Sequence, residues 1–136
     1  MREIKDHIVE GDLSQNQLKV EVTDKPGAGG ANHRYEITGF NTAQNQSSID
    51  KDGYHAGFSR MLVLFQNGPI QEVGVNGITQ EVLLAIVIDR LRSFQAGPYP
   101  SEANALALKH SEDALGYLQE RTKERLARGV EGQTKA

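Results

Sequence analysis

Apolar and polar residues alternate in the first half of the chain, which is the pattern of half-buried β-strands. The alternation runs from Leu18 to Asp24 and returns from Tyr35 to Thr38. A third apolar run, from Met61 to Gln66, stops at Asn67-Gly68-Pro69, which is a strong turn signal. We therefore expect a small antiparallel β-sheet within residues 1–70, a β-rich N-terminal region.

Two segments of this region have the composition of loops. Residues 25–32 are rich in glycine, but no strand-to-helix setting supports a phosphate-binding motif there. Residues 41–57 are polar and rich in Gln, Ser and Asp. A segment of that kind buries little apolar surface, so we expect a poorly ordered loop.

The second half of the chain changes to a helical pattern. Thr79 can cap a helix that carries Glu81 in its first turn and runs to Gln95. Because every residue from Val82 to Ile88 is apolar, the first half of this helix is apolar nearly all round. A two-layer monomer of this size rarely covers such a helix on all faces. We expect an interface between subunits to cover it.

A second helix follows after a break at residues 95–100, which contain Gly and Pro. It begins at Ser101 and can run to about Ala127, a length of about 40 Å. Its leucines form one stripe, with many charges opposite: Leu108, Leu115 and Leu118. Residues 71–136 are thus predicted to form a long antiparallel α-helical hairpin, which follows the small antiparallel sheet and makes the fold α+β.

Composition favours an oligomer with a small partner. The chain has 136 residues, of which 38% are hydrophobic and 6% aromatic, so a lone monomer would bury little apolar surface. The formal net charge of −3 argues against polymeric nucleic acid as the main partner, because such binding depends on phosphate neutralisation. A small anion held by a few local cations is compatible with this charge.

The chain carries no sign of secretion or membrane insertion. It contains no cysteine, which suits a reducing compartment. Its first residues, Met1 to His7, are charged from the second residue and lack the apolar stretch that a signal peptide needs. Its longest apolar run, Val82 to Ile88, is far shorter than the roughly 20 residues that span a bilayer. We expect a cytoplasmic protein.

No catalytic or metal-binding constellation is visible. The four histidines, at positions 7, 33, 55 and 110, have no partner at metal-ligand spacing, and no nucleophile elbow or zinc-protease helix occurs. Asp89 and Glu112 could act as general bases, but isolated helix carboxylates are usually solvated or paired with neighbours such as Arg92. We expect neither catalysis nor a cofactor.

Arginines near the C-terminus are the first candidates for ligand binding. Arg121 and Arg125 stand one turn apart on one helix face and would form a two-pronged guanidinium site. Guanidinium groups suit phosphate oxygens and stack on base planes, although cations at a helix C-terminus are commonly dipole partners alone.

Two further positions have both a binding and a structural interpretation. Phe94, at the end of the first helix, could stack on a base or could pack against Tyr99. The segment from Gly74 to Thr79 leads into a helix N-terminus, which can hold an anion, but a turn and a cap explain it adequately.

The runs that carry a resemblance to a known family lie between residues 65 and 132. They are Phe65 to Ile70, Glu72 to Thr79, Leu83 to Leu91, Phe94-Gln95, Glu102 to Leu108 and Glu120 through Gly132. This part resembles the helical hairpin domain shared by the type-one Thoeris anti-defence proteins and the type-two anti-CBASS sponges of phages. The β-rich segment before it, including Tyr35 to Phe40, favours the Thoeris branch, since the anti-CBASS proteins are essentially the hairpin alone.

The resemblance implies sequestration of cyclic ADP-ribose isomers, made by TIR-domain proteins, inside the infected bacterial cell and without turnover. By motif, Phe94 would stack on the base, Asn104 would hydrogen-bond the ligand, and Arg121 with Arg125 would hold phosphates or stack on the ligand from a neighbouring subunit. Some relatives also bind cyclic di- or trinucleotides at separate sites of a hexamer. The candidates for that second site are Asn76, Gly77 and Thr79.

Helix geometry adds one step. Asn104 and Arg121 are 17 residues apart on one predicted helix, hence about 25 Å, which is too far for one small ligand to touch both within a chain. A site that uses both must combine two subunits. Two alternatives stay open: a metal-independent cyclic-nucleotide hydrolase, and a purely structural oligomerisation hairpin.

Overall fold

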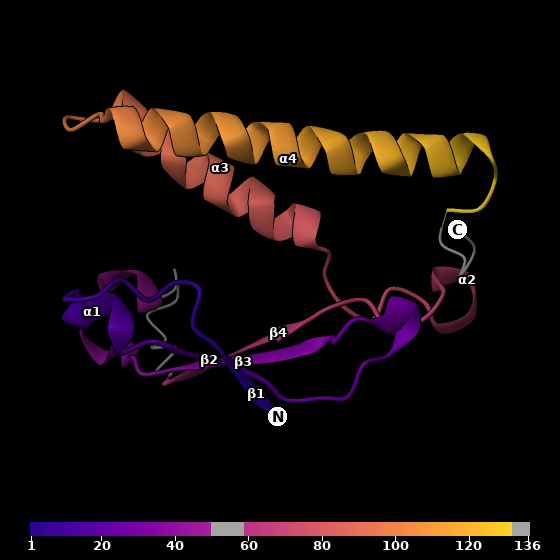
Figure 1. The fold of residues 1–136 in the computed structure, drawn as a ribbon, viewed down its shortest axis with the longest axis horizontal. Coiled ribbons are helices and arrows are strands. Elements are labelled where there is room, and N and C mark those ends of the chain that lie inside the picture. The colour runs from indigo at the N-terminus through magenta and orange to yellow at the C-terminus, as the bar shows by residue number, and fades with distance from the viewer. Residues whose placement is uncertain (50–58, 132–136) are drawn as a thin grey trace. The chain divides into compact units, whose positions relative to one another are not determined.

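The computed structural model describes residues 1–49 and 59–131. The chain divides into two compact units, Met1–Phe65 and Gln66–Ala136. The first contains an antiparallel sheet and the second contains two long helices (Figure 1). The expected α+β class, with a sheet followed by a helical hairpin, is confirmed.

The sheet has four strands in the order β1-β2-β3-β4, each antiparallel to its neighbour. Their bounds are Arg2–Ile4 for β1, Lys19–Val22 for β2, Arg34–Thr38 for β3 and Arg60–Leu64 for β4. The three strands that the sequence predicts are present. Strand β1 was not expected, because three residues in a charged segment show no alternation; it exists through its pairing with β2, in which Arg2 faces Val22.

Alternation along the strands gives the sheet one apolar face and one face on which charged and apolar residues mix, where Leu62 lies opposite Glu36. On the apolar face Val22 is buried and the rings of Tyr35 and Phe65 meet edge to face, with their centroids 5.6 Å apart. On the other face the carboxylate of Glu36 forms ion pairs with Arg34 at 3.6 Å and with Arg60 at 3.2 Å. This alternation gives the first unit its small core.

The loops of the first unit hold local structure. Asp24 closes the glycine-rich loop by accepting the backbone N–H of His33 at 3.0 Å. Residues 42–44 and 46–48 form two 3₁₀ turns, capped by the side chains of Asn41 and Asn45. The expected poorly ordered loop at 41–57 is therefore more structured than predicted up to Ile49, and its residues 50–57 lie outside the described part.

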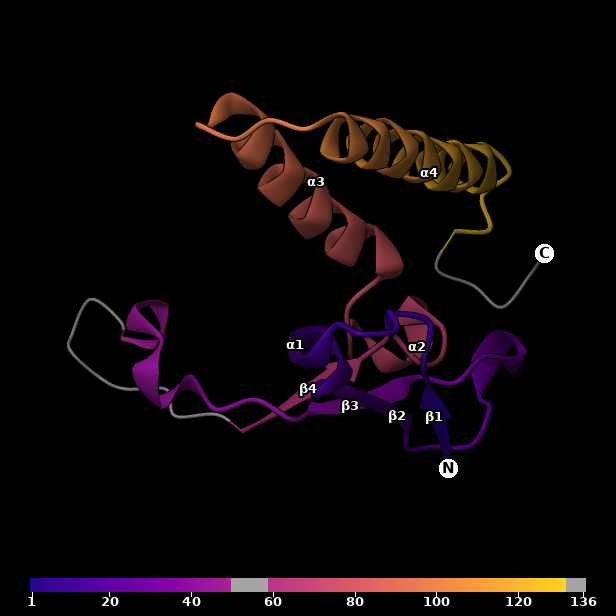
Figure 2. The same ribbon diagram turned by 60° about the vertical axis from the view of Figure 1, so that its left-hand side comes forward.

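Two long helices dominate the second unit. Helix α3 spans Gln80–Ala96 and helix α4 spans Glu102–Ala127, as the helical pattern predicts. Each unit also has a one-turn helix, α1 at Leu13–Asn16 in the first unit and α2 at Ile70–Val73 in the second. Both are too short for the sequence periodicity to predict them. Figure 2 shows α3 and α4 meeting at the turn that joins them.

Apolar side chains and an ion pair join α3 to α4. Ile88 is only 3% exposed, and Leu108, Leu115 and Leu118 are half-buried as their stripe predicts. Arg92 of α3 binds Glu112 of α4 at 2.7 Å. The pair joins the two helices across their interface.

Gly39 supplies a first prediction for the stability of the sheet. Its φ is +93°, and a side chain there would collide with the backbone carbonyl of Gln17. We expect Gly39→Ala to lower the free energy of unfolding by more than about 3 kcal/mol, because backbone must move. Gly29→Ala is the control: φ is +74° but the space is open, so we expect a loss of about 1 kcal/mol. Thermal unfolding followed by circular dichroism measures both, and equal losses would contradict the packing argument.

Candidate ligand-binding site

The turn between the two long helices is closed by side-chain hydrogen bonds. Oε1 of Gln95 accepts the backbone N–H of Ser101 at 2.9 Å. Oγ of Ser101 then accepts the N–H of Asn104 at 3.1 Å, which caps α4. These contacts bring Phe94, the residue before Gln95, and Asn104 to the same end of the hairpin.

Phe94 presents an accessible aromatic surface at this end. Its ring is 50% exposed, and the guanidinium carbon of Arg90 lies 5.4 Å from the ring centroid. Tyr99 is 86% exposed, so Phe94 does not serve as an apolar residue packed against Tyr99. The sequence analysis missed Arg90, although its spacing of four residues from Phe94 on a helix could have revealed the contact.

Asn104 offers hydrogen-bonding groups at the same end of the hairpin as Phe94. Its backbone N–H is used by the cap, but within the described ranges its side-chain amide has no hydrogen-bond partner. The side chain is half-buried. A carboxamide of this kind can donate to and accept from a polar ligand that stacks on Phe94.

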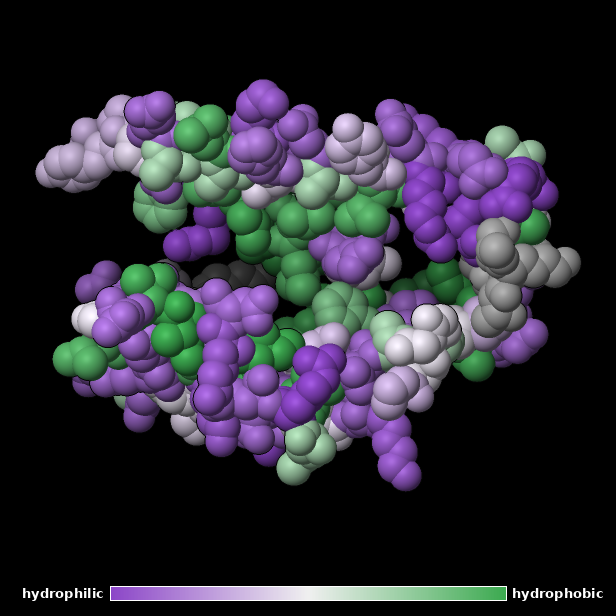
Figure 3. All heavy atoms as spheres, in the orientation of Figure 1, coloured by the Kyte–Doolittle hydropathy of each residue, from purple (hydrophilic) through white to green (hydrophobic). Residues whose placement is uncertain are grey.

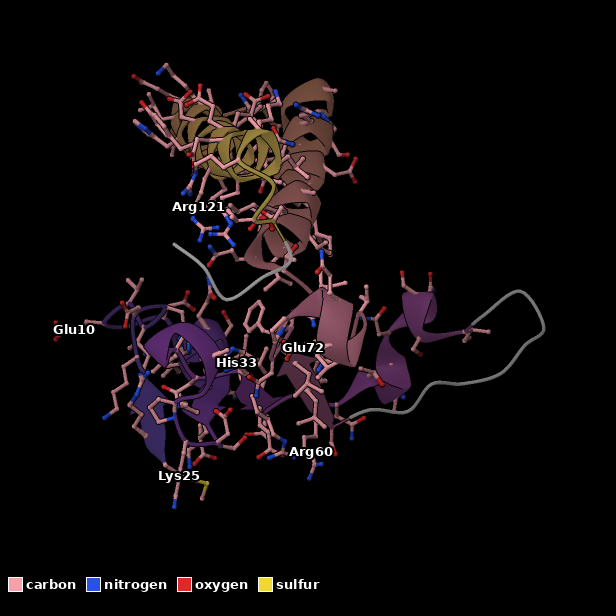
Figure 4. The ribbon with its side chains drawn as sticks, turned by 90° about the vertical axis from the view of Figure 1, so that its right-hand side faces the viewer. Glu10, Lys25, His33, Arg60, Glu72 and Arg121 are labelled. Carbon is pink, nitrogen blue, oxygen red and sulfur yellow. The ribbon has the colours of Figure 1, made fainter. Side chains whose placement is uncertain are left out.

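The two C-terminal arginines differ in their surroundings. Arg121 is exposed, and none of the carboxylates in residues 1–49 and 59–131 pairs with it; Figure 4 shows it projecting from α4. Arg125 is 5% exposed, and its Nε binds Glu131 at 3.1 Å while its Nη2 donates to the carbonyl of Val130 at 2.9 Å. The two guanidinium groups therefore do not form a symmetric pair of free prongs.

The segment before α3 is a loop closed by reciprocal amide contacts. Asn76 accepts the N–H of Asn67 at 2.9 Å and donates to the carbonyl of Asn67 at 2.8 Å. Oε1 of Gln66 accepts the N–H of Asn76 at 2.9 Å. Thr79 accepts the N–H of Val82 at 3.3 Å as the cap of α3, and Gly77 is half-buried. Turn and cap thus account for the contacts of Asn76 and Thr79.

The two ends of the hairpin lie too far apart to share one small ligand within a chain. Asn104 and Arg121 lie on the same unbroken helix, 17 residues and hence about 25 Å apart. One nucleotide-sized ligand cannot touch both within one chain.

The surface of α3 carries exposed apolar side chains. Ile86 is 54% exposed, and Val82 and Val87 are also exposed. Ile88, on the same helix, is buried. Exposed apolar residues on α4 include Leu106 and Tyr117. Hydrophobic side chains appear along the helical unit in Figure 3. Contiguous exposed apolar side chains of this kind mark surfaces that bind other molecules.

Histidines and carboxylates are the side chains of this chain that could bind a metal ion or transfer a proton. No group of three or more His, Cys, Asp or Glu side chains within them could hold a metal ion. His33 is buried in the first unit, where its Nδ1 has no hydrogen-bond partner, and Glu112 is paired with Arg92. His55 lies outside the described residues. Among the helices that the structure describes, none has the length and apolar character to cross a membrane.

Comparison with known proteins identifies the helical half. Residues 60–123 match the model of the Acb2/Tad1 hairpin domain. Over 70 residues the chain is 49% identical to "Thoeris anti-defense 1" of Bacillus phage SBSphiJ7. That alignment covers 52% of this chain and 49% of the relative, so it spans about half the length of each protein.

Proposed function

We propose, from the premise that this chain carries an Acb2/Tad1 hairpin domain at residues 60–123, that it is a phage anti-defence protein of the Thoeris type. It binds and sequesters cyclic ADP-ribose isomers made by TIR-domain proteins and does not degrade them. It acts inside the infected bacterial cell, where the messenger is made. The hairpin carries both ligand binding and assembly.

The observation that carries the proposal is the hairpin match, because it includes the side chains suited to the ligand. Residues 60–123 contain Phe94, Asn104 and Arg121. A cyclic ADP-ribose isomer offers an adenine ring, hydroxyl groups and a pyrophosphate. An exposed aromatic ring, an unused carboxamide and an exposed guanidinium are complementary to those three groups in that order.

The proposed site combines two chains. Phe94 and Asn104 of one protomer hold the base end of the messenger, and Arg121 of its partner meets the pyrophosphate, because Asn104 and Arg121 of one chain are about 25 Å apart on α4. The exposed apolar residues of α3 supply the interface between copies. The assembly is at least a dimer and, by analogy with the family, a hexamer.

A second class of ligand fits the same assembly. Cyclic di- and trinucleotides would bind near the start of α3, where Asn76, Gly77 and Thr79 stand. In the single chain Asn76 and Thr79 are used by the loop and the cap, so this site would rely on backbone N–H groups at the helix N-terminus.

Binding without turnover is the prediction that tests this function. The messenger is incubated with an equimolar amount of the protein, the complex is isolated and heated, and the released material is separated by chromatography. We expect unchanged messenger in a molar amount close to that of the sites, and we expect the protein to block a TIR-dependent effector only in stoichiometric excess.

The other outcomes separate the alternatives. A cleaved product, or loss of the signal with catalytic amounts of protein, would show a cyclic-nucleotide hydrolase. If the protein isolated after incubation carries no messenger, the hairpin would serve only as a structural oligomerisation element. Arg121→Ala serves as the control, because it should release little messenger while remaining folded.

A further inference from the structure

The chain reverses its direction at Gly129, directly after the C-terminal end of α4. The N–H of Gly129 donates to the carbonyl of Leu126, and the N–H of Val130 donates to the carbonyl of Arg125, each at 3.0 Å. With Gly129 at φ +72°, these bonds form a Schellman motif that ends the helix and reverses the chain. The reversal places the residues after Gly129 beside the last turn of the helix.

This turn places the carboxylate of Glu131 against the guanidinium group of Arg125. The carboxylate of Glu131 binds Nε of Arg125 at 3.1 Å, and the carbonyl of Val130 accepts from Nη2 at 2.9 Å. The Arg125 side chain is 6% exposed, whereas that of Glu131 is 31% exposed. The pair is thus mostly shielded on the arginine side and open to solvent on the carboxylate side.

Arg121 stands one helical turn before this pair and is exposed. A phosphate that approaches this end of α4 meets a free guanidinium at Arg121 and an occupied one at Arg125. A carboxylate and a phosphate oxygen are acceptors of the same guanidinium N–H groups. Because the Arg125 side chain is only 6% exposed and Glu131 occupies its Nε, a phosphate gains access to Nε where Glu131 leaves.

We infer that Glu131 competes with the ligand's phosphate for Arg125 and so determines how much anionic charge a ligand must bring to bind. This inference rests on the proposed function. A ligand with one phosphate binds Arg121 alone, because it gains too little to displace Glu131. A pyrophosphate has a second anionic group for Arg125, so Glu131 favours messengers that contain a pyrophosphate over singly charged ones.

The test compares Glu131→Gln with Glu124→Gln. Each variant removes one negative charge near the same helix end, but Glu124 is paired with the exposed Arg128. Two probes are titrated by calorimetry: the cyclic ADP-ribose isomer and inorganic pyrophosphate. If the ion pair between Arg125 and Glu131 is open in about a tenth of the molecules, Glu131→Gln should tighten binding of each probe about 10-fold. Glu124→Gln should change it by less than about 2-fold.

Two further variants separate competition from a structural role. Glu131→Asp keeps the charge but shortens the reach, so we expect a smaller gain in affinity in a chain that keeps its ion pair. In an Arg125→Gln background, Glu131→Gln should bring no gain, because the two residues act on one contact. Unchanged or weaker binding by both Glu131 variants, with thermal unfolding showing them folded, would overturn the inference.

Failure of the proposed function gives a different result. In that case the wild-type chain and Arg121→Ala would bind the messenger equally poorly. The pyrophosphate titrations of the Glu131 variants would still show whether the carboxylate competes with an anion for Arg125.

Discussion

Replacing Arg121 by alanine is expected to weaken binding of the cyclic ADP-ribose isomer by roughly 10- to 150-fold. Arg121 is exposed, and no carboxylate in the described part of the chain pairs with it, so its removal leaves no buried charge behind. The loss is that of one charge-assisted contact to phosphate, about 1.5 to 3 kcal/mol. Arg128→Ala is the matched control, because Arg128 ends the same helix but is paired with Glu124. If both variants lose the same affinity for the messenger, the effect comes from the net charge of this helix end and not from a contact of Arg121 with phosphate.

Mixing of subunits decides whether the site spans two chains. Arg121→Ala and Asn104→Ala are each expected to bind poorly as pure assemblies. In equal mixtures about a quarter of the sites should combine Asn104 of one protomer with Arg121 of its partner, and these should regain wild-type affinity. If heteromers form and no tight sites return, the two residues do not serve one ligand across an interface.

The two long helices could be predicted almost to the residue, because their signals are local. Thr79 and Ser101 each precede a helical pattern and cap the helix that follows, and residues 97–100 interrupt it. Strand β1 could not be predicted, because its three residues become a strand only by pairing with β2. Local patterns contain no information about such pairing.

The same limit explains what the sequence revealed of the site. The short turn between the helices was enough to predict that Phe94 and Asn104 lie at one end of the hairpin. The burial of Arg125 was not predictable from its spacing to Arg121. It depends on the positive φ of Gly129 and on where the reversed chain places Glu131, and both are properties of the folded turn.

Disruption of the apolar surface of α3 is expected to have the largest effect on function. Ile86 is 54% exposed in the single chain and stands one turn after the exposed Val82. Ile86→Asp removes about 2 kcal/mol of apolar burial from each contact and adds the cost of burying a carboxylate, so association should weaken by more than about 100-fold. Because the proposed site needs two chains, messenger binding should be lost together with assembly.

Light scattering after size-exclusion chromatography measures this result at micromolar concentration. The wild-type chain should be at least a dimer, and Ile86→Asp should be a monomer with unchanged helix content by circular dichroism. Gln119→Asp is the control: it places the same charge at an exposed position of α4 outside the apolar surface, and it should leave both assembly and binding intact. A wild-type chain that is monomeric, or an Ile86→Asp monomer that still binds the messenger tightly, would contradict the two-chain site, because each would show that one hairpin is sufficient to hold the ligand.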